Sequence, residues 1–374
     1  ENENVLHSVI IKELRNVKRE YGQERRTRIE AEVEEINYDK TAMIANERVV
    51  VTVSRDGYLK RVSMRSYNAV GDQETAIKDG DVLIGTTECD TLDTLLLFTS
   101  KGNYASIPVW QIEEGKWKDV GMHLNKVVRI DGEDKIKNAI LIKSFDTYAW
   151  IVTVSSAGQI KKTPVNNWQV ERNNKVMTAM NLGKGAEMIN AFIVYSNQQI
   201  LMVSKDGYSY RFAVEDIPAT GVKSKGVKAM NLGKGDALAW GCVMNAEDPA
   251  VLFMTNVGQM KRVHTEEIVF GNRPMKGNLI CKRLKTNPSI VTLAKAVSAG
   301  EELVFKDPER QVIRASEIPL KPRESGFGSP IVLKDGWDLY RGIDECRIID
   351  IPTDADNEVH EDVERLSLFD EKED

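Results

Sequence analysis

The chain of 374 residues has few of the residue types on which enzymes and metal sites depend. It holds four cysteines, far apart and without a C-x-x-C pair, and four scattered histidines without an H-E-x-x-H motif. Neither a disulfide framework nor a zinc site is indicated, and a reducing cytoplasm is the natural location. No apolar run approaches the roughly 20 residues of a membrane helix, and no signal peptide is visible. We therefore expect a cytoplasmic protein with no membrane partner, no metal site and no cofactor.

Motifs of catalysis are missing as well. The glycine-rich residues 181–185 lack the P-loop pattern and do not open a helix, and the paired acidic residues fall in turns, where solvation explains them. No catalytic residue is assigned, and we expect no enzymatic activity from this chain.

Negative charge is concentrated at the end of the sequence. The net charge is −6, yet residues 353–374 hold ten acidic residues and two basic ones, so residues 1–352 are slightly basic. This composition predicts a disordered acidic tail. Such a tail either competes with phosphates for nearby basic residues or only keeps the chain soluble.

Residues 5–21 place apolar side chains along one stripe of a helix, and Gly22 ends the pattern. The sequence predicts one amphipathic helix with no second helix beside it. Its apolar face packs either on the domain that follows or on a part of a larger protein, of which we expect this chain to be a fragment. We assign residues 1–32 to this helix and a linker.

From residue 33 to residue 352 the sequence repeats a short β-rich unit. Each unit has an apolar strand, a tight turn and a second strand, and the turns lie 45, 56, 49, 51 and 52 residues apart. Their last residues are Gly57, Gly102, Gly158, Gly207, Gly258 and the degenerate Arg310. Glycine supplies the positive φ that tight hairpins require, and the period leaves room for two more strands per unit. We predict an all-β fold, a six-bladed β-propeller with four strands per blade. The alternative of separate small β domains finds no linkers to support it.

Basic residues recur at one place in the repeat. Four residues beyond the turn, every unit except the second has a lysine or arginine, and in three units the preceding residue is a lysine. These candidates are Lys60, Arg61, Lys161, Lys162, Arg211, Lys261, Arg262 and Arg314. Because equivalent positions of a propeller lie at equal height, they predict a ring of positive charge that suits a bent polyanion. The alternative is that they only discourage edge-to-edge pairing of exposed hairpins.

The loop of residues 219–235 adds four candidate lysines among four glycines and no acid: Lys223, Lys225, Lys228 and Lys234. Glycine lets the backbone approach a phosphate closely, and lysine supplies counter-charge without reading bases. Aromatic residues for stacking on single strands are sparse, so duplex DNA is the expected partner.

These repeats resemble the blades of the C-terminal domain of type IIA topoisomerase A subunits, over essentially residues 5–352. The segment before the first blade is similar to the passage that leads those subunits from their coiled-coil region into that domain: Lys18-Arg19-Glu20-Tyr21-Gly22-Gln23-Glu24-Arg25-Arg26-Thr27. The resemblance implies a β-pinwheel, a propeller whose neighbouring blades exchange strands, and a domain that binds and bends duplex DNA.

One motif separates the two branches of this family. The A subunits of gyrase carry a Q-R-R-G-G-R-G type box in the first blade, and the resemblance ties that box to tight wrapping of DNA. Here the corresponding residues 67–75 contain no arginine. The sequence therefore resembles the topoisomerase IV branch, which unlinks and relaxes DNA.

The resemblance implies that the catalytic tyrosine lies outside this chain. A parent dimer of A subunits and an ATPase B subunit would use ATP and Mg²⁺ through other domains, near the bacterial nucleoid. Two alternatives remain: a gyrase wrapping domain without a recognisable box, and a propeller that serves as a protein-interaction scaffold. The usual G-H…W-D repeat signature of such scaffolds is missing.

Overall fold

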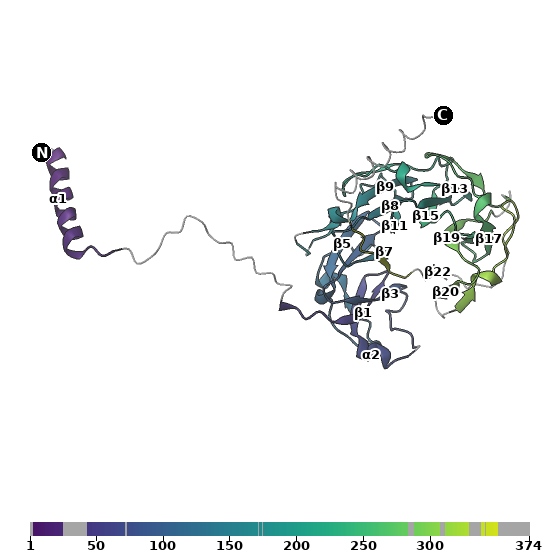
Figure 1. Cartoon of the computed structure of the whole chain (residues 1–374), viewed down its shortest axis with the longest axis horizontal. Coiled ribbons are helices and arrows are strands. Elements are labelled where there is room, and N and C mark those ends of the chain that lie inside the picture. Colours follow the sequence, from purple (N-terminus) through teal and green to yellow (C-terminus); the bar gives the residue numbers. More distant parts are fainter. Residues whose placement is uncertain are drawn as a thin grey trace, which may run out of the picture. The chain divides into compact units, whose positions relative to one another are not determined.

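The computed structural model describes residues 3–24, 43–71, 73–170, 172–173, 175–282, 288–306, 311–328, 338–340 and 342–350. The chain divides into two units, Glu1–Met43 and Ile44–Asp374 (Figure 1). The acidic segment 353–374, the sixth turn at 307–310 and the boundary expected at residues 32 and 33 lie outside the described residues.

The first unit contains the predicted helix, α1 (Glu3–Tyr21). None of its side chains is buried, and its apolar residues are largely exposed, with Leu14 at 62%. The amphipathic pattern is confirmed, and within the described residues its apolar face has no partner.

The second unit is built on the six predicted hairpins. Their two strands pair antiparallel in every case. They are β1 (Arg48–Ser54) with β2 (Tyr58–Ser63), β4 (Thr94–Thr99) with β5 (Asn103–Pro108), β8 (Trp150–Ser155) with β9 (Gln159–Pro164), β12 (Gln199–Ser204) with β13 (Tyr208–Ala213), β16 (Ala250–Thr255) with β17 (Met260–His264), and β20 (Glu302–Lys306) with β21 (Gln311–Arg314). The five turn glycines have φ between 73° and 91°, as the turns require.

A third strand follows each of the first five hairpins and pairs with its first strand. These inner strands are β3 (Leu83–Asp90), β7 (Ile136–Ile142), β11 (Met188–Val194), β15 (Leu238–Met244) and β19 (Val291–Val297). They contact one another in chain order, so the sheets follow one another around a common centre (Figure 1). The sixth sheet has β22 (Asp338–Leu339) in this place.

Four sheets receive their outermost strand from the following repeat. The exchanged strands are β6 (Met122–His123) on β2, β10 (Met177–Thr178) on β5, β14 (Val227–Lys228) on β9 and β18 (Asn278–Leu279) on β13. On β17 a single bridge between Met260 and Gly328 takes this position. The strand exchange implied by the resemblance is thus present.

The predicted four strands hold for the first, third and fourth sheets. The fifth and sixth have three strands each among the described residues, and the second has five. The fifth strand of the second sheet is β23 (Asp344–Cys346), which pairs in parallel with β7 although it follows the sixth hairpin. Just before it, the hydroxyl oxygen of Tyr340 accepts a hydrogen bond of 2.7 Å from the backbone N–H of Thr86 in the first sheet.

Short helical turns follow the second hairpin strands or β6. They are α2 (Met64–Asn68), η2 (Val109–Gln111), η3 (Leu124–Lys126), η4 (Val165–Trp168), η5 (Val214–Asp216), η6 (Thr265–Glu267) and η7 (Ala315–Glu317). The hydrophobic core is divided accordingly, with one cluster between each pair of consecutive sheets. Burial of both faces explains why the hairpin strands read as continuous apolar runs.

Candidate nucleic-acid interface

Three of the predicted cations are buried and bind backbone carbonyl groups of other segments. Lys60, Lys161 and Lys261 each lie three residues beyond their turn glycine and are at most 1% exposed. Each ammonium group donates to three backbone carbonyl groups of segments that cover its own sheet. The carbonyl partners are those of Ala76, Trp117 and Asp119 for Lys60, those of Ala179, Gly221 and Val222 for Lys161, and those of Pro322, Arg323 and Ser325 for Lys261.

Aromatic rings support these buried ammonium groups. Trp117, Trp168 and Phe327 have ring centroids 5.5, 5.2 and 5.4 Å from the nitrogens of Lys60, Lys161 and Lys261. Burial lowers the pKa of Lys60 and of Lys261 to about 8 and the pKa of Lys161 to about 7. A lysine in this environment has almost no surface left for a phosphate, because its ammonium group is buried and already bonded to backbone carbonyl groups.

The residue four positions beyond the turn glycine joins its sheet to the following sheet in three cases. Lys162 donates to the carbonyl of Val214 in η5 at 3.0 Å. Arg211 donates to Ile268 at 3.1 Å, and Arg262 donates to Ile318 at 2.9 Å, just after η6 and η7. In the third, fourth and fifth sheets this position thus anchors the helical turn of the next sheet.

The remaining two residues of the predicted ring differ from this pattern. Arg61 is half-buried and its Nε has no hydrogen-bond partner among the described residues, whereas Arg314 is exposed and lies 4.0 Å from Glu302. The structure therefore does not bring the eight predicted ring residues together as one exposed surface.

The four loop lysines, in contrast, are exposed. Lys223 and Lys225 stand in the segment that leads to β14, Lys228 is in β14 itself, and Lys234 follows in a tight turn. Because β14 is the outermost strand of the third sheet, the first three lysines lie at its outer edge.

Cations that our sequence analysis missed occupy the same place in other sheets. Exposed basic residues lie immediately before or within each exchanged strand, and we call these residues, which include the first three loop lysines but not Lys234, the edge cations. They are Lys116 and Lys118 before β6, Arg172 and Lys175 before β10, Lys223, Lys225 and Lys228 at β14, and Lys276 before β18. The signal in the sequence was the recurrence of basic residues some 60 to 70 residues after each turn glycine.

Glycine fixes three of these edges. Gly121, Gly226 and Gly277 stand immediately before β6, β14 and β18 with φ of 90°, 80° and 79°. A Cβ atom at any of them would lie 2.4 Å from a backbone oxygen of the neighbouring strand. Only glycine allows such a close approach at this backbone conformation.

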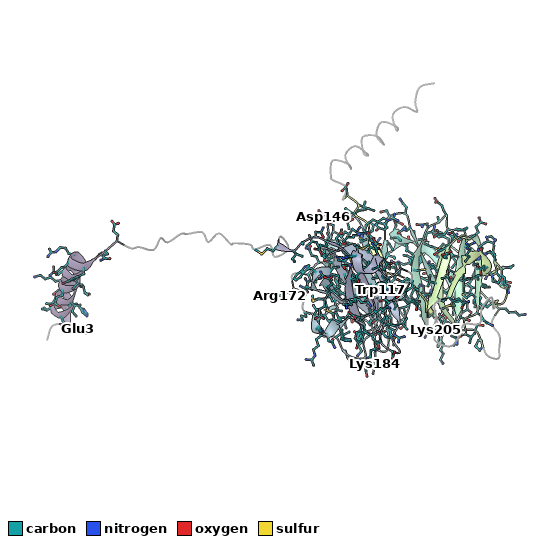
Figure 2. The ribbon with its side chains drawn as sticks, turned by 90° about the horizontal axis from the view of Figure 1, so that it is seen from below. Glu3, Trp117, Asp146, Arg172, Lys184 and Lys205 are labelled. Carbon is teal, nitrogen blue, oxygen red and sulfur yellow. The ribbon has the colours of Figure 1, made fainter. Side chains whose placement is uncertain are left out.

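Two exposed lysines share a repeated stretch of sequence. Lys184 and Lys234 occupy the same place in two identical stretches, Met-Asn-Leu-Gly-Lys-Gly, at residues 180–185 and 230–235. Figure 2 shows Lys184 and Lys205 on one side of the second unit, with Asp146 on the opposite side. In the sequence, residues 181–185 stand out only as a glycine-rich stretch that lacks the P-loop pattern.

Other kinds of site find no support in the described part of the chain. No group of three or more His, Cys, Asp or Glu side chains there is placed to hold a metal ion. No described helix combines the length and the apolar character needed to cross a membrane.

Comparisons with known proteins agree with the fold. The profile of the DNA gyrase C-terminal domain, β-propeller, matches residues 48–71, 93–143, 149–194 and 198–240. The A subunit of DNA topoisomerase 4 from Bacillus subtilis (strain 168) is 34% identical over 87% of this chain, and that from Staphylococcus aureus (strain MRSA252) is 34% identical over 80%. The chain spans 40% and 37% of the length of these two relatives.

Solved structures show the same relationship. The crystal structure of the C-terminal domain of DNA topoisomerase IV is 31% identical, with a TM-score of 0.72 over 79% of this chain and 92% of that chain. The structure of the DNA gyrase A C-terminal domain, 20% identical with a TM-score of 0.61 over 79% of this chain and 98% of that chain, shares the fold. With its exchanged strands and its similarity to these relatives, the chain belongs to the family of C-terminal domains found in the A subunits of DNA gyrase and DNA topoisomerase IV.

Proposed function

We propose that this chain is the DNA-binding domain from the A subunit of a topoisomerase IV and that it holds duplex DNA along the outer edges of its sheets. The observation that carries this proposal is the recurrence of exposed cations before β6, β10, β14 and β18. A repeated positive charge at equivalent edges matches the repeated negative charge of a phosphate backbone.

The edge cations favour binding without sequence preference. They are mostly lysines on loops, and no described helix of the second unit is longer than the five residues of α2, too short to read a major groove. Because successive edges turn around a common centre, a duplex that follows them must bend. Smooth bending of a 20–30 bp site costs about 1–6 kcal/mol, which the additional phosphate contacts offset.

Within the parent enzyme, the domain would present DNA segments for decatenation and relaxation. Cleavage of DNA would belong to the rest of the dimer of A subunits, and ATP and Mg²⁺ would be used by other domains and by the B subunit. The domain would bind DNA in the bacterial cytoplasm, at the nucleoid, and would need no cofactor of its own.

The two alternatives lead to different measurements. A gyrase-type wrapping domain would impose strong chirality on bound DNA, although residues 67–75 contain no arginine. An interaction scaffold would bind a protein and leave DNA unbound.

The edge cations provide the direct test. We would replace Lys118, Lys175, Lys225 and Lys276 with Gln and measure binding of a duplex of about 40 bp by fluorescence anisotropy from about 50 to 300 mM salt. Each lost phosphate contact lowers the magnitude of the slope of log K against log salt by about 0.9, so the variant, which loses four contacts, should lose about 3.6 units of slope. Two unrelated duplex sequences should give the same result.

A matched control removes equal charge elsewhere. Lys101, Lys126, Lys135 and Lys143 each lie within 3.0 Å of a carboxylate, and their replacement with Gln should leave the slope nearly unchanged. Equal losses in both variants would mean that net charge, and not the edge, determines binding. Strong preference for one sequence would also overturn the proposal.

A further inference from the structure

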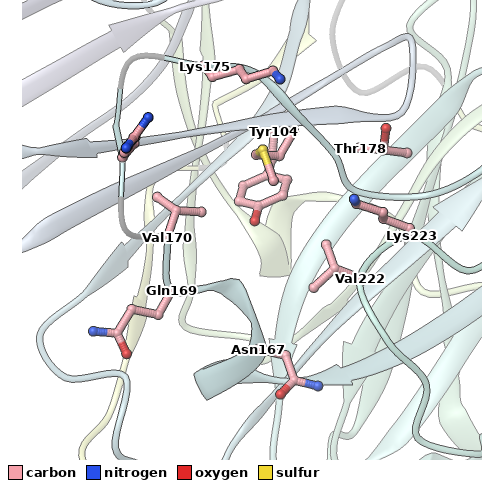
Figure 3. A pocket seen from close by; sticks show the side chains of 10 residues that line it. Tyr104, Asn167, Gln169, Val170, Lys175, Thr178, Val222 and Lys223 are labelled. Carbon is pink, nitrogen blue, oxygen red and sulfur yellow. The ribbon is translucent and has the colours of Figure 1, made fainter. Parts of the chain in front are cut away.

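A pocket of about 510 Å³ opens at the outer end of the interface between the second and third sheets. Its lining comes from β5, from the segment around β10 and from the loop before β14 (Figure 3). Three segments distant in sequence therefore meet here because strand exchange brings them together. The volume lies in the range of pockets for small organic ligands and exceeds the needs of a single phosphate.

The hydroxyl group of a buried tyrosine faces this pocket and has no partner among the described residues. Tyr104 is 2% exposed, its ring packs against Phe98 and Trp168, and its hydroxyl makes no hydrogen bond within the described part of the chain. Figure 3 shows this hydroxyl between the side chains of Val170 and Val222. By contrast, the buried Tyr210 of the fourth sheet donates its hydroxyl to the carbonyl of Ala229. The Tyr104 hydroxyl is therefore a donor at the pocket wall that no described residue uses, and it can serve a ligand that accepts a hydrogen bond.

The rim of the pocket is positive. Arg172, Lys175 and Lys223 line it with exposed side chains, and none of them forms a salt bridge with a described residue. No acidic side chain is among the described residues that line the pocket. An anionic group at the rim would therefore meet three cations.

The interior is apolar with a few polar groups. Val170, Met177 and Val222 supply apolar walls, and the amides of Asn167 and Gln169 supply donors and acceptors at the opening. Such walls suit a flat heterocyclic ligand. The thioether of Met177 can pack on the ring of the ligand, and the two amides can form hydrogen bonds with its ring nitrogens and exocyclic groups.

We propose that this pocket binds a single nucleotide unit. Its phosphate lies at Arg172, Lys175 and Lys223, and its base lies against the apolar walls. An acceptor atom of the base or sugar accepts a hydrogen bond from the Tyr104 hydroxyl. The nucleotide is either free or part of a single strand. Binding at this pocket is independent of duplex binding, because a base can enter the pocket only when it is unpaired. The pocket would thus contact a base at a surface whose other cations contact only phosphates.

Calorimetric titration of the whole chain with deoxyadenosine 5′-monophosphate tests the proposal. Deoxyadenosine lacks the phosphate and inorganic phosphate lacks the nucleoside, so each should bind at least tenfold more weakly than the mononucleotide. A ten-residue oligo-deoxyadenosine distinguishes the sources: tighter binding than the mononucleotide assigns the site to single strands, and equal or weaker binding assigns it to free nucleotides. Phosphate that binds as well as the mononucleotide would overturn the proposal, as would no mononucleotide binding up to about 10 mM.

Two substitutions connect binding to the pocket. Tyr104→Phe removes the hydroxyl and should weaken mononucleotide binding about 3- to 10-fold, as expected for one neutral hydrogen bond. It should leave the melting temperature and the duplex affinity unchanged, because the hydroxyl has no partner among the described residues. Lys175→Met should weaken binding by a similar factor, while the controls Tyr148→Phe and Lys184→Met, outside the pocket, should not. Unchanged mononucleotide binding in Tyr104→Phe would exclude the pocket as the site, whatever the duplex affinity of the edge variants.

Discussion

The ammonium nitrogen of Lys261 donates a hydrogen bond of 2.8 Å to the backbone carbonyl of Arg323, 62 residues further along the chain. The same lysine position in the first and third sheets holds an equivalent segment. Strand exchange in this fold thus depends on buried cations as well as on the short exchanged strands, which pair through only two residues each.

Replacement of Lys261 with Met should destabilise the fifth sheet. The substitution keeps the length and apolar packing of the side chain but leaves three carbonyl groups without their donor, at a cost of about 2 to 3 kcal/mol. Urea unfolding followed by tryptophan fluorescence measures the loss. The exposed Lys205→Met should change stability by less than about 0.5 kcal/mol, and an equal effect of both substitutions would contradict the structural role.

Stability should rise with pH through the titration of Lys161. Burial lowers the pKa of this lysine from 10.5 to about 7, so between these pH values the unfolded chain binds more protons than the folded chain. The free energy of unfolding therefore increases from about pH 7 towards about pH 10. Lys161→Met removes this contribution. The cysteines and tyrosines titrate in the variant as in the natural chain, so their contribution cancels in the comparison. The variant should show a smaller gain between about pH 7 and pH 9.5, and parallel curves would mean that Lys161 stays protonated.

Gly226 should be essential for the edge at β14. Its φ of 80° and the 2.4 Å between an added Cβ atom and the Ile160 oxygen make Gly226→Ala doubly unfavourable, by about 2 to 3 kcal/mol. The variant should expose residues around β14 to hydrogen exchange and weaken duplex binding. Gly221→Ala, in the same loop with nothing within 4 Å of an added Cβ atom, is the control and should behave like the natural chain.

The domain should not wrap DNA with strong chirality. Residues 67–75 contain no arginine, so the first sheet has no equivalent of the gyrase box. After incubation with nicked plasmid and ligation, the topoisomer distribution should stay close to that of free DNA. A large positive shift in linking number would favour the gyrase alternative.

The hairpins, their turns and their order could be predicted from the sequence because these features are local. The glycine between β8 and β9, Gly158, has the positive φ that its turn requires, and apolar runs such as β4 are buried as expected. The fate of Lys161 could not be predicted in the same way. Two adjacent lysines near a hairpin suggest an exposed edge, but here a segment from some 60 residues further along covers that edge and supplies carbonyl groups.

The exposed cations depend on the same long-range relationship. Lys175 and Lys276 are unremarkable lysines in loops until strand exchange places their segments at the outer edges of the second and fourth sheets. The pocket at Tyr104 is still further from sequence patterns, since its walls come from three repeats.

The parallel pairing of β23 with β7 affects how the chain can be made. Asp344 lies against Asn138, 206 residues earlier, so a ribosome releases the second sheet long before the strand that completes it. At about 5–20 residues per second the delay is about 10–40 seconds. During this interval one edge of β7 offers unpaired backbone groups to any nearby strand. Newly made chains should therefore be most prone to aggregation after the second sheet has emerged and before residue 344 arrives, the interval in which a chaperone would help most.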